Sequence, residues 1–176
     1  MPAMPGHHLP ARAVIVMGVS GCGKSTLGAL LAQALDCPFL EGDAFHSAQA
    51  VEKMRGGSAL TDDDRWPWLD RLGHAVTDAL EQHGAVVAAC SALRLAYRDR
   101  LRAAIGADVR FVFLDNSREH LLERLGNRPG HYMPASLLDS QLATLERPLG
   151  NEAAMALVTD HPPEDLRDAV LRWLEG

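Results

Sequence analysis

The chain has 176 residues, of which 47% are hydrophobic and 23% are charged, and its formal net charge is −6. This length suits a single domain of about 100–200 residues with a core of its own. The acidic balance argues against nucleic acid as the main partner, because such proteins need a basic face. No apolar run approaches the roughly 20 residues of a membrane helix, so we expect no membrane association.

Three cysteines, Cys22, Cys37 and Cys90, are spaced without a Cys-x-x-Cys pair. This pattern favours reduced thiols over a disulfide framework or a zinc site, and it predicts a cytoplasmic protein. Residues 1–12 are rich in proline and lack the apolar segment of a signal peptide, so we interpret them as a flexible tail. Residues 13–176 are predicted to form one domain.

A phosphate-binding loop follows the first predicted strand. Residues 18–25 are Gly-Val-Ser-Gly-Cys-Gly-Lys-Ser and match the pattern Gly-x4-Gly-Lys-Ser/Thr. An apolar, β-branched run at 13–17 precedes the loop, and leucines recur at helical spacing after it. A strand, a glycine-rich turn and a helix N-terminus together form a cradle of backbone N–H groups for an anion. A chance glycine turn before an ordinary helix would not need this whole context.

The loop predicts that the protein binds a nucleoside triphosphate. Lys24 would reach the β- and γ-phosphates and take part in catalysis, and the Ser25 hydroxyl would ligate Mg²⁺. We assign nucleotide binding to the whole segment, namely Gly18, Val19, Ser20, Gly21, Cys22, Gly23, Lys24, Ser25 and Thr26.

Strands and helices alternate along the rest of the chain. The predicted strands are 13–17, 38–40, 85–90, 109–114 and 156–159. Helices are predicted after Lys24 and over 47–54, 66–83, 95–105, 118–125, 135–145 and 163–174. This alternation predicts an α/β domain with a parallel sheet and right-handed crossovers, which binds ligands at the C-terminal ends of its strands.

Polar residues follow two more of the predicted strands. Residues 41–43 follow the second strand, and residues 90–93 follow the third. Because parallel strands end at the same edge of a sheet, both segments should lie beside the phosphate loop. Asp43 could accept a proton from an attacking hydroxyl, or orient it. Alternatively, Asp43 caps the helix that follows.

Several arginines could bind anionic groups. Arg98 lies on a predicted helix with Arg94 four residues before it, a spacing that by itself favours an exposed helix face. Arg124 and Arg128 run into a polar glycine-proline loop, which predicts a mobile lid that brings arginines over the γ-phosphate. Arg65 follows three acids, so it either pairs with them or faces the cleft. His46 and His131 lie near the expected site, without the spacing of metal ligands.

A set of sequence blocks resembles a known family. The phosphate loop is followed by Glu-Gly-Asp-Ala-Phe-His at 41–46 and by Leu-Thr-Asp-Asp-Asp-Arg-Trp-Pro-Trp-Leu at 60–69. Cys-Ser-Ala-Leu at 90–93, Arg-Pro-Gly-His-Tyr-Met at 128–133 and the segment 140–146 complete the set. In this order, over about residues 13–160, the blocks resemble the gluconokinases of the short, phosphate-loop type, which are related in fold to shikimate kinase.

The resemblance implies ATP-dependent phosphorylation of D-gluconate at its 6-hydroxyl. It implies a P-loop NTPase three-layer sandwich with a five-stranded parallel sheet, a lid at about 124–135, and a homodimer. Asp43 would engage the attacking hydroxyl, and Glu41 would help to place Mg²⁺ through water. Arg124 and Arg128 would be the lid arginines that bind the nucleotide, and Arg128 would also serve catalysis. The candidates for binding the substrate are Asp43, His46, Arg65, Ser91, Arg98 and His131.

Two alternatives remain open from the sequence. A related small-molecule kinase acting on shikimate, adenylylsulfate or a nucleoside monophosphate would be expected to carry different acceptor-site blocks. A non-catalytic, nucleotide-binding regulator would not need Lys24, Asp43 and the lid arginines together.

Overall fold

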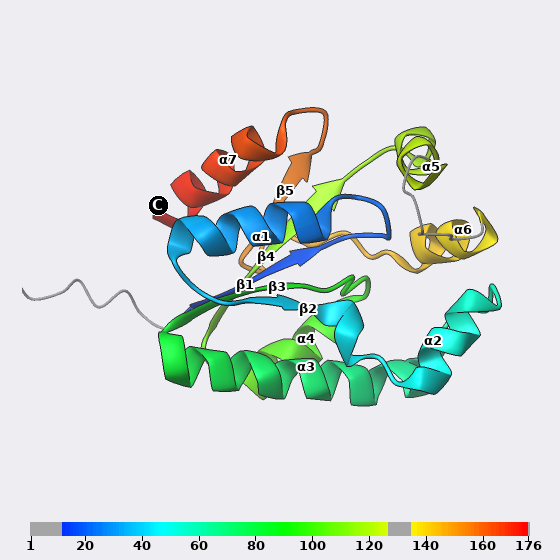
Figure 1. Ribbon diagram of the computed structural model, residues 1–176, viewed down its shortest axis with the longest axis horizontal. Helices are drawn as coiled ribbons and strands as arrows, with labels where there is room; N and C mark the ends of the chain where they lie inside the picture. Colours follow the sequence, from blue (N-terminus) through cyan, green and yellow to red (C-terminus); the bar gives the residue numbers. More distant parts are fainter. Residues whose placement is uncertain (1–11, 127–134, 176) are drawn as a thin grey trace, which may run out of the picture.

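A computed structural model describes residues 12–126 and 135–175 and shows the predicted α/β sandwich (Figure 1). Five strands form one sheet in the order β2-β3-β1-β4-β5, and each pairing is parallel. The strands are β1 (Arg12–Met17), β2 (Phe39–Glu41), β3 (Ala85–Ala89), β4 (Asp108–Asp115) and β5 (Ala154–Val158). The helices are α1 (Lys24–Leu35), the short 3₁₀ helix η1 (Gly42–Phe45), α2 (Ala48–Arg55), α3 (Asp62–His83), α4 (Leu95–Ile105), α5 (Arg118–Gly126), α6 (Ala135–Thr144) and α7 (Pro163–Glu175).

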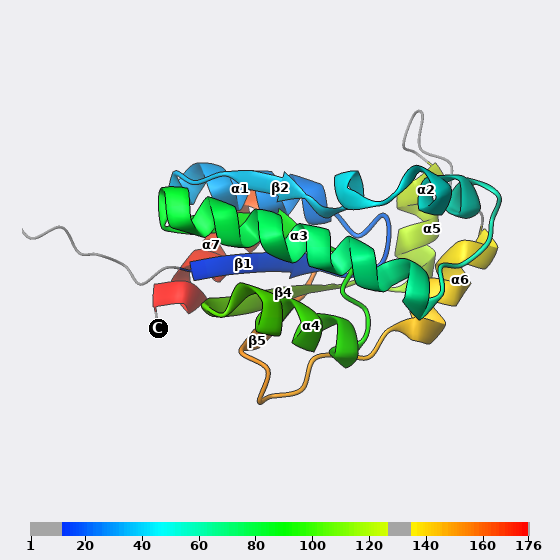
Figure 2. The same ribbon diagram turned by 90° about the horizontal axis from the view of Figure 1, so that it is seen from below.

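Helices cover both faces of the sheet. Alternate residues of β1 show how: Ala13 and Ile15 pack toward α3 and α4, whereas Val14 and Val16 pack toward α1 and α7. All four side chains are buried. The apolar run predicted at 13–17 is therefore a central strand that is packed on both sides. Figure 2 shows α3 and α4 together on one face of the sheet.

The long helix α3 starts four residues earlier than the sequence pattern predicted. The Thr61 hydroxyl accepts the amide N–H of Asp64 at 3.2 Å, and the Asp64 carboxylate accepts the amide N–H of Thr61 at 2.8 Å. This reciprocal capping box begins the helix at Asp62, upstream of Pro67. The early start places Asp62, in the acidic first turn of α3, beside Arg65 and Tyr97.

All five strands differ from their predicted bounds by one or two residues, and pairing explains the differences at Arg12 and Ala154. Arg12 belongs to β1 and not to the predicted tail, because it pairs with Ala85 and Asp108, and its side chain donates to Asp108 at 3.3 Å. β5 begins at Ala154, two residues before the predicted start, because Ala154 pairs with Phe111 of β4. Neighbouring strands supply these pairings, so local sequence carries little signal for them.

The parallel arrangement brings separate segments to one edge of the sheet. β1 leads into the phosphate loop, β2 leads into η1, and β3 leads into residues 90–94. α5 and α6 stand beyond the same edge, at the right of Figure 1. None of the helices in the described ranges combines the length and hydropathy needed to cross a bilayer.

Candidate active site

The phosphate loop turns sharply between β1 and α1. Gly18, Gly21 and Gly23 have φ angles of 146°, 84° and 98°, a region that side chains disfavour. Gly23 also leaves room for a neighbour, since a Cβ there would lie 2.9 Å from Nη1 of Arg124. The loop therefore wraps closely around the N-terminus of α1, and the guanidinium of Arg124 lies beside it.

Lys24 and Ser25 begin α1 and point functional groups toward the loop and β2. The Lys24 ammonium donates to the carbonyl oxygens of Gly18 and Val19, at 3.0 Å each. The Ser25 hydroxyl donates to the carboxylate of Glu41, the last residue of β2. A hydroxyl and a carboxylate beside a phosphate cradle are the kind of oxygen ligands that Mg²⁺ takes, together with water and phosphate. Within the described ranges, no three His, Cys, Asp or Glu residues gather into a further metal-binding group.

Gln141 of α6 contacts the phosphate loop at two points. Its side-chain oxygen accepts the amide N–H of Ser20 at 2.8 Å, and its side-chain nitrogen donates to the Ser20 hydroxyl at 3.2 Å. This contact joins residues that lie 121 positions apart in the sequence. The sequence places Gln141 only within the family-like segment 140–146 and predicts no contact for it.

Asp43 projects from η1 at the end of β2 and does not cap the helix that follows. That helix, α2, is capped by Ser47, whose hydroxyl accepts the amide N–H of Ala50 at 3.1 Å. The Asp43 side chain is 75% exposed. The preceding residue, Gly42, packs directly against β3, because a Cβ there would lie 2.1 Å from the carbonyl oxygen of Ala89. The structure thus removes the capping alternative and leaves the Asp43 carboxylate free to meet a ligand.

His46 lies beside Asp43 and packs on a tryptophan. Its ring stacks on Trp68 with 4.1 Å between ring centroids, and its Nε2 lies 3.9 Å from Oδ1 of Asp43. Trp68 in turn donates its indole N–H to the carbonyl oxygen of Gly42 at 2.7 Å. Burial lowers the pKa of His46 below 6.5 and outweighs the opposing effect of the Asp43 carboxylate; Arg71 and Arg65 lower it further. The neutral imidazole is therefore the form that this packing favours at neutral pH.

Arg65 fulfils both of the alternatives left open by the sequence. Its Nη1 lies 3.5 Å from Asp62 and donates to the hydroxyl of Tyr97 at 2.8 Å. Tyr97 also donates to Asp62, which completes a triangle of side chains. Arg65 nevertheless faces the cavity described next, so the ion pair orients the guanidinium without removing it from the site.

A cavity of about 240 Å³ joins the phosphate loop to these side chains. Lys24, Asp43, His46, Arg65 and Ser91 all line it. Its remaining lining residues are Ser20, Val51, Met54, Ala59, Leu60, Trp68, Leu93, Tyr97, Leu137, Ser140 and Gln141. One end carries the cation of the phosphate loop, and the other carries polar groups suited to a hydroxylated, anionic molecule.

Arg98 is the exception among the predicted substrate residues. Its side chain is 0% exposed and is absent from the lining of this cavity. Its guanidinium donates to the Glu152 carboxylate at 2.7 and 3.3 Å, and to the carbonyl oxygens of Ala92 at 2.7 Å and Glu146 at 3.0 Å. The prediction that Arg98 binds substrate is therefore wrong for this structure, because its donors are engaged inside the protein.

A second cavity, of about 180 Å³, lies beside the loop and is lined by α7 and α5. Cys22, Thr26, Arg124 and Thr159 line it, together with Gly23, Leu27, Leu114, His161, Pro163 and Leu166. The Thr159 hydroxyl is buried and has no hydrogen-bond partner among the described residues. Four of the residues predicted to bind nucleotide, namely Cys22, Gly23, Thr26 and Arg124, thus face a cavity distinct from that of Asp43.

The predicted lid is described only in part. Arg124 belongs to α5, and residues 127–134 lie outside the described ranges. Arg128 and His131 are among these, so their assigned roles stay predictions.

Comparison with known proteins places this chain in a family. The sequence matches a family described as an AAA domain over residues 14–148. It is 44% identical over 171 residues to a gluconokinase of Gluconobacter oxydans, an alignment that covers 96% of this chain and 94% of that protein. The chain belongs to the gluconokinase family. It is also 42% identical over 138 residues to the thermosensitive gluconokinase of Escherichia coli, covering 78% of this chain and 73% of that protein.

Solved structures agree with the assignment to the gluconokinase family. A crystal structure of a gluconokinase from Sinorhizobium meliloti has a TM-score of 0.84 and 43% identity, covering 94% of this chain and 92% of that one. A shikimate kinase from Aquifex aeolicus has a TM-score of 0.56 at 19% identity, covering 93% and 96% of the two chains. That distant likeness confirms the predicted P-loop kinase fold and carries no further information.

Proposed function

We propose that this protein transfers the γ-phosphoryl group of ATP to the 6-hydroxyl of D-gluconate. The observation that carries the proposal is one cavity lined by Lys24 of the phosphate loop, the Asp43 carboxylate and the Arg65 guanidinium. A phosphotransferase needs three groups within one enclosed space. These are a cation that binds the phosphates, a base that accepts the proton of the attacking hydroxyl, and a group that pairs with the charge of the acceptor. Membership of the gluconokinase family supports gluconate as the acceptor.

The acceptor would lie between Asp43 and Arg65. Asp43 accepts the hydrogen bond of the 6-hydroxyl and takes up its proton as the new oxygen–phosphorus bond forms. The bond from the γ-phosphorus to the β–γ bridging oxygen breaks, and ADP leaves with that oxygen. Arg65, held by Tyr97, pairs with the carboxylate at the other end of the substrate. Ser91 and His46 contribute polar contacts along the chain of hydroxyls.

The nucleotide would occupy the loop and the smaller cavity. Backbone N–H groups of the loop and the Lys24 ammonium hold the phosphates. We propose that the adenine base lies in the cavity beside α7, where Arg124 offers a planar cation and the buried Thr159 hydroxyl has no hydrogen-bond partner among the described residues. Arg124, with Arg128 of the lid, would offset charge on the transferred phosphoryl group.

Ser25 and Glu41 are the residues that would hold Mg²⁺. Their side chains already share a hydrogen bond beside the loop. When bound, the ion would neutralise phosphate charge as in other phosphoryl transfers.

A cytoplasmic location, independence from nucleic acid and a homodimer are further parts of the proposal. All three cysteines carry free thiols, which fits a reducing compartment. Light scattering on the purified protein tests the dimer directly, and a single monomer mass at working concentration contradicts it.

The test of function is ADP release measured with a panel of acceptors. We expect stimulation by D-gluconate, and little by shikimate, adenosine 5′-phosphosulfate or AMP. The phosphorylated product should carry phosphorus on the 6-oxygen by ³¹P NMR. If another acceptor stimulates ADP release and gluconate does not, that acceptor is the substrate instead of gluconate. Nucleotide binding without turnover for any acceptor would favour a non-catalytic regulator.

A further inference from the structure

The turn that follows β3 contains a strained residue. Ala92 has a φ angle of 45° and is fully buried. A left-handed backbone is unfavourable for alanine relative to glycine, so surrounding contacts must hold it. The turn is part of the site, because Ser91 and Leu93 line the cavity that also contains Asp43. The Ser91 carbonyl oxygen also accepts the amide N–H of Gly18, the first residue of the phosphate loop, at 3.2 Å.

Arg98 supplies the side-chain contact to the strained residue of this turn. Its Nη1 donates to the carbonyl oxygen of Ala92 at 2.7 Å, directly at the strained residue. The guanidinium is fixed from its other side by two hydrogen bonds to the Glu152 carboxylate. Glu152 is itself buried and also accepts from Arg102 and from the amide of Leu149. These hydrogen bonds lower the pKa of Glu152 despite its burial, so the carboxylate stays charged opposite Arg98.

The same turn receives the segment that follows α6. The amide N–H of Glu146 donates to the carbonyl oxygen of Leu93 at 2.7 Å. The Glu146 carboxylate accepts the amide N–H of Leu95 at 3.1 Å. Arg98 adds a hydrogen bond to the carbonyl oxygen of Glu146. Leu137 and Gln141 on α6 also line the cavity that contains Asp43. One buried guanidinium therefore contacts both the turn after β3 and the segment after α6, and each of these adjoins residues that line the cavity of Asp43.

We propose that Arg98 is a positioning residue for the phosphoryl acceptor. With Glu152 it holds the Ser91–Leu93 turn in its left-handed form and keeps the segment after α6 in register with that turn. The identity of the acceptor in this inference rests on the proposed function. Lysine cannot replace the guanidinium, because a single ammonium does not reproduce a planar fork that meets a carboxylate and two carbonyl groups together.

The test compares Arg98→Lys with Arg100→Lys. Arg100 lies on the same helix but pairs with Asp70 at the surface, with both hydrogen bonds at 2.8 Å. For Arg98→Lys we expect kcat/KM for gluconate to fall about 10–100-fold, as for a displaced acceptor, with the KM for ATP nearly unchanged. Arg100→Lys should leave both constants unchanged. A fall in thermal stability alone, or equal losses for ATP and gluconate, would assign Arg98 a merely structural role.

Ala92→Gly provides the second arm. Glycine adopts the left-handed backbone without help from the Arg98 hydrogen bond. Adding this substitution to Arg98→Lys should therefore restore part of the lost kcat/KM for gluconate. In the wild-type background the same substitution should produce no gain. The absence of rescue would overturn the inference. If Arg98→Lys is insoluble, Glu152→Gln, which removes the charge that fixes the guanidinium, is tested by the same criteria.

Hydrogen exchange separates this inference from the proposed function. Amides of residues 91–96 should exchange faster in Arg98→Lys than in Arg100→Lys, whichever acceptor the enzyme uses. If the wild-type enzyme does not phosphorylate gluconate, only the proposed substrate is refuted. Unchanged hydrogen exchange at residues 91–96 would refute only the proposal that Arg98 positions this turn.

Discussion

The two sides of the site are built in different ways. The phosphate side comes from one continuous stretch, residues 18–26, and its geometry depends on glycines within that stretch. The acceptor side is assembled from η1, α3, the turn after β3 and α6, which are far apart in the sequence. Its functional groups are held through partners, as Tyr97 holds Arg65 and Trp68 holds His46. Phosphate binding is therefore a local property of this chain, and acceptor choice is a property of its packing.

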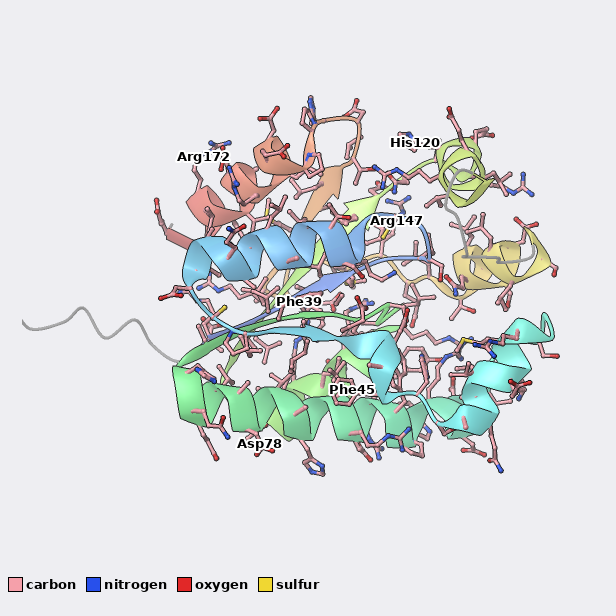
Figure 3. All side chains as sticks on the ribbon, viewed as in Figure 1. Phe39, Phe45, Asp78, His120, Arg147 and Arg172 are labelled. Atoms are coloured by element: carbon pink, nitrogen blue, oxygen red, sulfur yellow. The ribbon has the colours of Figure 1, made fainter. Side chains whose placement is uncertain are left out.

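Asp43→Asn should produce the largest effect, and it should separate turnover of the acceptor from binding of ATP most clearly. An amide cannot take up the hydroxyl proton, so kcat should fall about 10²–10⁴-fold, with ATP binding nearly intact. Steady-state kinetics and nucleotide titration measure the two quantities. Asp78→Asn is the matched control, since Asp78 is exposed on α3 and lies away from the site (Figure 3). Activity within a few-fold of wild type would remove Asp43 from the chemistry.

Lys24→Met tests the phosphate side. Loss of the cation should lower kcat about 10²–10³-fold with any acceptor, because it meets the phosphates and not the acceptor. The control is Lys53→Met, which removes the chain's other lysine, one that pairs with Asp64 at 2.7 Å. A loss confined to gluconate binding would contradict the division into two sides.

Arg65→Met should affect acceptor binding above all. Removing a charge-assisted contact to the carboxylate should raise the KM for gluconate about 10–100-fold while kcat changes less. Phosphorylation of an uncharged sugar alcohol, if measurable, should be insensitive to this substitution. An equal penalty on the sugar alcohol would show that Arg65 serves another purpose.

His46 should produce the smallest effect, visible in stability against pH. Its folded-state pKa is lowered, mainly by burial, so the unfolded chain binds the proton more readily. This contribution to stability is present above about pH 6.5, the ordinary pKa of histidine, and is lost as the pH falls toward the folded-state value. Thermal melts between pH 5 and pH 8 should show a shallower slope for His46→Gln than for wild type. The exposed His74→Gln should leave the slope unchanged.

Much of the fold was predictable because its signals are local. α4 was predicted at its observed bounds, and the end of α3 was predicted correctly although its start was placed four residues too late. The segment holding Asp43 was predicted from the edge rule for parallel strands. By contrast, the strand limits at Arg12 and Ala154 depend on neighbouring strands, whose pairing no local window contains.

By itself the sequence determined that a nucleotide phosphate is bound, where the loop lies, and which strand ends stand beside it. These features follow from glycine conformations, helix termini and the parallel order of strands, all of which short segments encode. Only the tertiary structure decided that Arg98 clamps a turn instead of binding substrate, and that Gln141 bonds to Ser20. Arg98 meets Glu152 across 54 positions and Gln141 meets Ser20 across 121. Spacing along a helix identifies a face, but packing alone determines what that face meets.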